Sequence, residues 1–184
     1  MASELQTALP APGDTIAIIK TSMGEMKAKF FETEVPEGSK NFIELAKQGK
    51  YTKVPFHRVI EGFVIQGGDF TAFNGTGGHS HKGEGTNIGD EYNDDLTHIR
   101  GALSWAKTAA PNSIGSQFFI VHPEGGAHFL DHPKDGGSSE GYTVFGQVYE
   151  GHDIIDAIIA APTDRNDCPY DEITLIEVEI TTAD

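Results

Sequence analysis

The chain has 184 residues, 38% of them hydrophobic and 11 of them phenylalanine, which is enough apolar material for one domain with a single core. Its 13 lysine and arginine residues stand against 28 aspartate and glutamate residues, and a net charge of −15 disfavours binding to nucleic acid or to an anionic membrane. The single cysteine excludes an internal disulfide, and the first residues show neither a signal peptide nor a membrane span, so we expect a cytoplasmic protein.

The 22 glycines point to many turns and hence to a mainly β chain. Residues 1–13, which contain two prolines, are predicted to be a flexible tail, and residues 14–184 are predicted to form one domain. The polar segment at 132–141 has the composition of a surface loop. Apolar periodicity predicts strands at residues 15–20, 24–31, 56–60, 63–66, 101–106, 117–121, 142–149 and 173–180.

Two helices are predicted between these strands. The first opens at Val35-Pro36, because proline suits the first helical position, and it ends at Gly49. The second covers residues 152–159, where four isoleucines form one apolar stripe. About eight strands and two helices suit an antiparallel closed barrel with a helix at each end.

Residues 56–70 predict a hairpin, in which two short apolar runs flank a Glu-Gly turn. Side chains alternate along a strand, so Arg58 is predicted to share a face with the apolar Phe56 and Ile60. Gln66, on the outgoing strand, is the nearest uncharged polar group that can hold its guanidinium. Taken alone, an exposed arginine on an edge strand is the commoner case.

A second stretch, residues 112–121, runs from a glycine-bearing loop into a strongly apolar strand. Alternation places Gln117 and Phe119 of this strand on one face. This strand and the hairpin strand of Arg58 would then line an apolar pocket that holds one hydrogen-bond donor, the forked guanidinium of Arg58. This composition is typical of a small-ligand or peptide site.

With these residues in view, the chain resembles a known family. The stretches at residues 56–60, 63–69, 74–78 and 115–120 look like signature blocks of the cyclophilins, which are peptidyl-prolyl cis-trans isomerases. The resemblance runs from about Thr15 to Ile180, with the blocks in family order. It implies an eight-stranded antiparallel closed β-barrel capped by two α-helices. It also implies an isomerase (a rotamase) that speeds rotation about Xaa-Pro bonds and assists protein folding.

The resemblance further implies which residues act. Arg58 is expected to donate to the prolyl nitrogen of the twisted amide, Gln66 to orient it, and Phe63 to complete the catalytic set. No metal and no cofactor are implied, and none of the eight histidines stands at a metal-ligand spacing. The expected substrate-binding residues are Val64, Ala106, Lys107, Gln117, Phe119, Phe129, Leu130 and Tyr142.

Four positions depart from the family pattern. Phe129 stands where the best-known members have tryptophan, Tyr142 where many have histidine, Val64 where methionine is commoner, and Lys107 where asparagine is commoner. That tryptophan is the family's partner for cyclosporin, so only weak binding of the drug is expected.

Other interpretations remain open at this point. Without the resemblance, Phe63, Phe119 and Phe129 would be read as core aromatics. A non-catalytic module that binds proline-containing peptides would use the same pocket, although binding alone does not require Arg58. A lipocalin-like carrier would need small residues inside the barrel, whereas this chain is rich in bulky ones. The expected partners are proline-containing peptides and folding proteins, with no nucleic acid and no membrane, and the protein is expected to be a monomer.

Overall fold

The computed structural model describes residues 1–133 and 141–184, so most of the polar segment predicted at 132–141 lies outside the described residues. The strands are β1 (Thr15–Thr21), β2 (Gly24–Phe30), β3 (Val54–Pro55), β4 (Arg58–Val59), β5 (Val64–Gly67), β6 (Ala102–Trp105), β7 (Phe118–Val121), β8 (Val144–Glu150) and β9 (Thr174–Thr182). The helices are α1 (Glu4–Thr7), α2 (Pro36–Lys47) and α3 (His152–Ile159), together with the single-turn 3₁₀ helix η1 (His128–Leu130).

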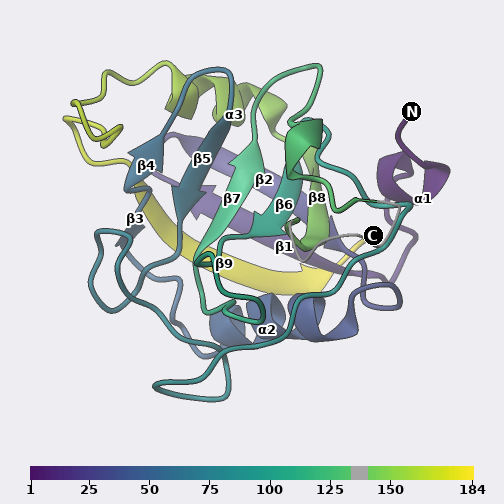
Figure 1. Ribbon diagram of the computed structural model, residues 1–184. Coiled ribbons are helices and arrows are strands. Elements are labelled where there is room, and N and C mark those ends of the chain that lie inside the picture. The colour runs from purple at the N-terminus through teal and green to yellow at the C-terminus, as the bar shows by residue number, and fades with distance from the viewer. Residues whose placement is uncertain (134–140) are drawn as a thin grey trace.

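All nine strands form one antiparallel sheet in the order β3-β9-β1-β2-β8-β6-β7-β5-β4. The two edge strands, β3 and β4, are separated in the chain by only Phe56 and His57, so the sheet must curl back on itself (Figure 1). The predicted mainly β, antiparallel architecture is confirmed. The described residues contain nine strands rather than the predicted eight, because β3 was not predicted. Val54-Pro55 is very short, and proline disfavours a strand.

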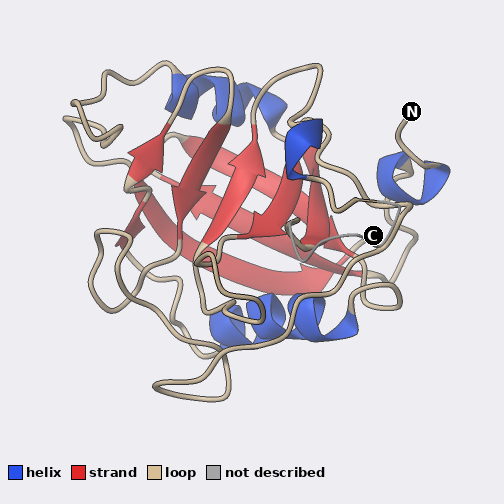
Figure 2. Ribbon diagram, in the orientation of Figure 1, coloured by secondary structure: helices blue, strands red, loops and turns tan. Residues whose placement is uncertain are grey.

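The two longer helices cover opposite ends of the curled sheet, as predicted (Figure 2). Pro36 occupies the first turn of α2, and α3 follows Gly151, whose φ of 91° lies in the left-handed region that glycine tolerates. Helix α2 packs into the core through Phe42, which is fully buried against Tyr51, Phe118 and other aromatic rings. Among the described residues, no helix has the length and apolar character needed to cross a bilayer.

The faces of the first hairpin strand differ from the prediction. Phe56 does not share a face with Arg58: its side chain is 1% exposed and meets Phe118 edge-on in the core, whereas Arg58 is exposed. The reason is that residues 56–57 lie between two strands, so regular alternation begins only at Arg58. The β4–β5 hairpin itself forms as predicted, with Arg58 opposite Gln66.

The N-terminal segment also differs from the predicted loose tail. Residues Glu4–Thr7 form the short helix α1, which Ser3 caps by accepting a hydrogen bond from the backbone N–H of Gln6. Gln6 is fully buried, and its amide bonds to Thr97 and Gln147. Two prolines and the lack of an apolar period indicate a tail, but polar contacts with residues distant in the sequence, among them those of the buried Gln6 amide, hold this segment on the sheet.

Candidate active site

Four strands place one row of side chains on the same face of the sheet. The register pairs Arg58 of β4 with Gln66 of β5, Gln66 with Phe119 of β7, and Phe119 with Ser104 of β6. Alternation sends the neighbouring Phe118 to the opposite face, into the core. The row therefore runs from an exposed guanidinium, through an amide and an aromatic ring, to a buried hydroxyl.

The guanidinium of Arg58 is held by a relay of two amides. Arg58 Nη1 donates to Gln66 Oε1 over 3.3 Å, and Gln66 Nε2 donates to Gln117 Oε1 over 3.1 Å. Gln117 Nε2 in turn donates to the carbonyl oxygens of Gly75 and Gly77, at 2.9 and 2.8 Å. Because both carbonyls can only accept, they fix the Gln117 amide, which fixes Gln66 with its oxygen towards Arg58.

The turn that presents these two carbonyls is built around Asp69, which is fully buried. Its carboxylate accepts hydrogen bonds from the backbone N–H groups of residues 71, 72, 74, 75 and 77. Burial alone would raise the pKa of Asp69, but these donors outweigh burial and lower the pKa from 3.8 to about 2. A Cβ at Gly77 would lie 2.7 Å from Asp69 Oδ1, so glycine is required where the turn closes on the carboxylate.

A hollow of about 150 Å³ opens beside Arg58; we call it the proline hollow, after the ring that the resemblance stated above would place there. Nine of the eleven residues selected from the sequence line the hollow: Arg58, Phe63, Val64, Gln66, Ala106, Lys107, Phe119, Leu130 and Tyr142. Gln117 lies next to the hollow, hydrogen-bonded to Gln66. Phe129 stacks on Phe63 with ring centres 5.4 Å apart, and it is 77% exposed. The structure thus brings all the selected residues to one place.

A second hollow of about 400 Å³ adjoins the first and shares Gln66, Ala106 and Lys107 with it. The Lys107 ammonium lies between the two, paired with Asp90 over 3.1 Å, and it also donates to the hydroxyl of Tyr92 over 3.2 Å. Burial alone would lower the pKa of Lys107, but these two partners outweigh burial and raise it. Lys107 therefore stays charged.

Behind the proline hollow lies a polar group that sequence reasoning missed. The imidazole Nδ1–H of His98 donates to Asp131 Oδ1 over 2.6 Å, and its Nε2 shares a hydrogen bond of 2.9 Å with Ser104 Oγ. The ring of His98 also stacks on Phe119, with centres 5.9 Å apart. Burial lowers the pKa of His98, and Asp131 opposes that effect. No sequence signal could identify this trio, because Asp131 lies 33 residues from His98 in the chain.

In residues 1–133 and 141–184, no group of three or more histidine, cysteine, aspartate or glutamate side chains is arranged to hold a metal ion. His57 precedes Arg58 in the chain, and burial lowers the pKa of His57, which favours its neutral form beside the guanidinium. What the geometry offers is an oriented cation beside a small hollow whose walls combine apolar and polar side chains.

Comparisons with known proteins agree with this geometry. The family model described as cyclophilin type peptidyl-prolyl cis-trans isomerase matches residues 16–180. Peptidyl-prolyl cis-trans isomerase B of Escherichia coli is 34% identical over 165 residues, covering 88% of this chain and 96% of that protein. A putative peptidyl-prolyl cis-trans isomerase of Staphylococcus saprophyticus is 38% identical, covering 89% of this chain and 90% of its own length.

A solved structure is also similar to this chain. The cyclophilin type peptidyl-prolyl cis-trans isomerase of Cryptosporidium parvum, crystallised in the presence of the dipeptide Ala-Pro, superposes with a TM-score of 0.80. Its sequence is 33% identical, and the match covers 91% of this chain and 99% of that one.

Proposed function

We propose that Arg58 is the catalytic donor of this chain, which belongs to the cyclophilin-type peptidyl-prolyl cis-trans isomerase family and is such an isomerase. Rotation about an Xaa-Pro bond crosses a barrier of about 18–20 kcal/mol that arises from amide resonance. In the twisted amide the prolyl nitrogen regains its lone pair and becomes a hydrogen-bond acceptor. A guanidinium beside that nitrogen binds the twisted amide better than either planar one, and such differential binding accelerates the reaction.

The observation that carries this proposal is the amide relay behind Arg58. The guanidinium lies on the rim of the hollow that Phe63, Phe119 and Leu130 wall, and its position is set by Gln66 and Gln117 before any substrate arrives. A donor that is already oriented needs no reorganisation as charge shifts in the transition state. Reaching turnovers of many per second requires roughly 6–8 kcal/mol of barrier lowering, which one such donor and clamping of the flanking peptide can supply.

The substrates that fit are proline-containing segments of folding proteins. We place the proline ring in the hollow walled by Phe63, Phe119 and Leu130, because these side chains supply apolar surface of the required size. The residues before proline would then occupy the adjoining hollow, gripped by Gln117 and by the backbone at Ala106. A cytoplasmic location and a monomeric state complete the proposal, and the single cysteine supports the former.

We expect Arg58→Ala to lose most of the catalysis while the fold is kept, because Arg58 is exposed and its removal leaves no buried group unpaired. The measurement is exchange NMR of a short Ala-Pro peptide with catalytic amounts of protein. A loss of about 10²–10³ in kcat/KM is expected for one such electrostatic donor. Arg58→Lys keeps the charge without the planar fork and should recover only part of the activity.

The control is Arg165→Ala, because Arg165 is exposed and lies outside the lining of the proline hollow. Arg165→Ala should accelerate the cis-trans exchange of the peptide as much as the wild type does. If Arg58→Ala retains wild-type exchange rates, the assigned donor is wrong. If the wild type binds the peptide without accelerating exchange, the protein is a proline-binding module instead.

A further inference from the structure

The inner wall of the proline hollow depends on the position of His98. Its backbone N–H donates to Asp131 Oδ1 over 2.7 Å, and its carbonyl accepts from the N–H of Ala127 over 2.7 Å. Ala127 and Asp131 are the residues on either side of η1, the helix that carries Phe129 and Leu130. With its ring bonds and its stacking on Phe119, His98 therefore joins η1 to the sheet.

His98 follows an irregular segment, and that segment is fixed by the N-terminus of the chain. Ser3 Oγ donates to the carbonyl of Asp95 over 2.5 Å. Gln6 accepts from the backbone N–H of Thr97 over 2.9 Å and donates to its carbonyl over 2.7 Å. The Gln6 amide also donates to Gln147 Oε1 over 3.1 Å, so its donor and acceptor ends are both satisfied while it is fully buried.

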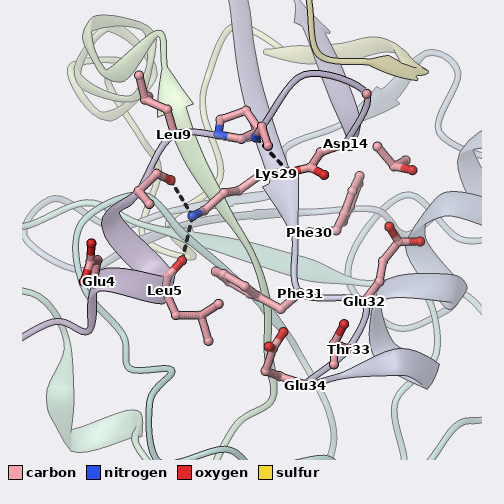
Figure 3. A pocket seen from close by; sticks show the side chains of 15 residues that line it. Glu4, Leu5, Leu9, Asp14, Lys29, Phe30, Phe31, Glu32, Thr33 and Glu34 are labelled. Carbon is pink, nitrogen blue, oxygen red and sulfur yellow. Dashed lines mark hydrogen bonds between the residues drawn. The ribbon is translucent and has the colours of Figure 1, made fainter.

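A second anchor holds residues 3–8, which we call the N-terminal strap, to the sheet. The ammonium of Lys29, on β2, is 7% exposed and donates to the carbonyls of Leu5 and Ala8, the former over 2.7 Å. Figure 3 shows this ammonium between the two carbonyls, on the wall of a hollow of about 650 Å³. The strap is thus fixed to β2 at one point and to residues 95–97 at another.

We propose that the N-terminal strap is a positioning element of the isomerase site, and that Gln6 is the positioning residue which acts through His98. Removing the Gln6 amide would leave the backbone N–H of Thr97 without its partner, a change that irregular backbone relieves by moving. Movement at Thr97 displaces His98, and with it the ring of Phe119 and the helix η1. The strap precedes residue 16, where the family match begins, so it is an addition to the matched domain. The inference rests on the proposed function.

The test compares kcat/KM for the Ala-Pro peptide in the wild type, Gln6→Ala and the control Leu9→Ala. Leu9 is 73% exposed and belongs to the same N-terminal segment. At a temperature where circular dichroism shows every variant folded, Gln6→Ala should lose about three- to tenfold in kcat/KM, and Leu9→Ala should lose nothing. Gln6→Met keeps the side-chain volume without the donors, and it replaces Gln6→Ala should that variant not fold.

A second readout separates positioning from mere stability. The Nδ1 proton of His98, held in a hydrogen bond of 2.6 Å, should give a far-downfield proton NMR signal that shifts or broadens in Gln6→Ala. A Gln6→Ala variant that melts earlier but keeps the wild-type kcat/KM overturns the proposal. A variant that loses activity while the His98 signal stays unchanged overturns it as well, because the loss would then not act through His98. A wild type without isomerase activity overturns the proposed function itself, and is thereby distinguished from a failure of the strap alone.

Discussion

At the scale of single residues, the amide relay explains why an exposed arginine is part of a site. Arg58 taken alone resembles any edge-strand arginine, and its exposure does not distinguish it. Its partner Gln66 lies directly opposite in the hairpin, and Gln117 directly precedes β7, the next strand of the sheet. The sequence pointed to Gln66 as the nearest uncharged polar group and to Gln117 by strand alternation, but not to the glycine carbonyls that orient them.

Phe129 gives a residue-level prediction. Its ring lies flat on Phe63 and is 77% exposed, so an indole fits there without steric cost. We expect Phe129→Trp to bind cyclosporin about five- to tenfold more tightly, because it adds aromatic surface and one N–H donor worth about 1 kcal/mol in all.

Isothermal titration calorimetry measures this change, and Phe129→Leu serves as the matched variant, since it removes the ring and should weaken binding. Peptide isomerisation by Phe129→Trp should stay within about twofold of the wild type, because no reacting group changes. Equal affinities of the wild type and Phe129→Trp would show that this position does not set the drug's affinity.

At the scale of elements, the turn at residues 69–77 is the part that makes the relay rigid. Asp69 gathers five backbone N–H groups, and the same turn directs the carbonyls of Gly75 and Gly77 to Gln117. The sequence showed only a glycine-rich stretch after Asp69. Which backbone groups converge on one carboxylate depends on the path of the turn, and residue periodicity carries no information about that path.

This turn predicts a specific sensitivity to acid. The pKa of Asp69 is about 2 in the folded protein and 3.8 in an unconstrained chain, so its stabilisation is complete above 3.8 and is lost as the pH falls through about 2. The contribution amounts to roughly 2 kcal/mol. Asp69→Asn lacks this contribution of the carboxylate. The difference in free energy of unfolding between wild type and variant should therefore shrink by roughly 2 kcal/mol as the pH falls from about 5 to about 2.

Urea unfolding at each pH measures this difference, and Asp171→Asn is the control, because Asp171 is exposed. A difference between wild type and Asp69→Asn that stays constant across the range would contradict the assigned role of the carboxylate.

At the scale of the whole molecule, the net charge of −15 acts against the fold. Exposed ion pairs such as Lys20–Glu179 and Lys27–Glu150 contribute little, because solvent screens them. The excess of carboxylates repels itself throughout the compact state. Repulsion should therefore outweigh the surface pairs.

Salt is the simplest test of this balance. Because screening shortens the range of repulsion, we expect Tm at neutral pH to rise by several degrees between about 10 mM and about 200 mM sodium chloride. Differential scanning calorimetry records the change, and at about pH 5, near the sequence pI of 4.8, the effect should nearly vanish. A Tm that falls with salt would mean that the surface ion pairs dominate.

The sequence by itself determined the mainly β fold, the hairpin and the family, and it selected residues that the structure brings together around one hollow. These follow from local alternation, from turn chemistry and from a resemblance carried by short blocks. It placed Phe56 on the wrong face and treated residues 1–13 as a tail.

Only the tertiary structure decided what lies behind the site. Gln6 meets Thr97 across 91 residues of chain, and His98 meets Asp131 across 33. Each pair is joined by two hydrogen bonds, and the partner is fixed by how the sheet curls and not by any local pattern. Local patterns specify which side chains face the core, whereas the pairing of isolated buried polar groups depends on the whole fold.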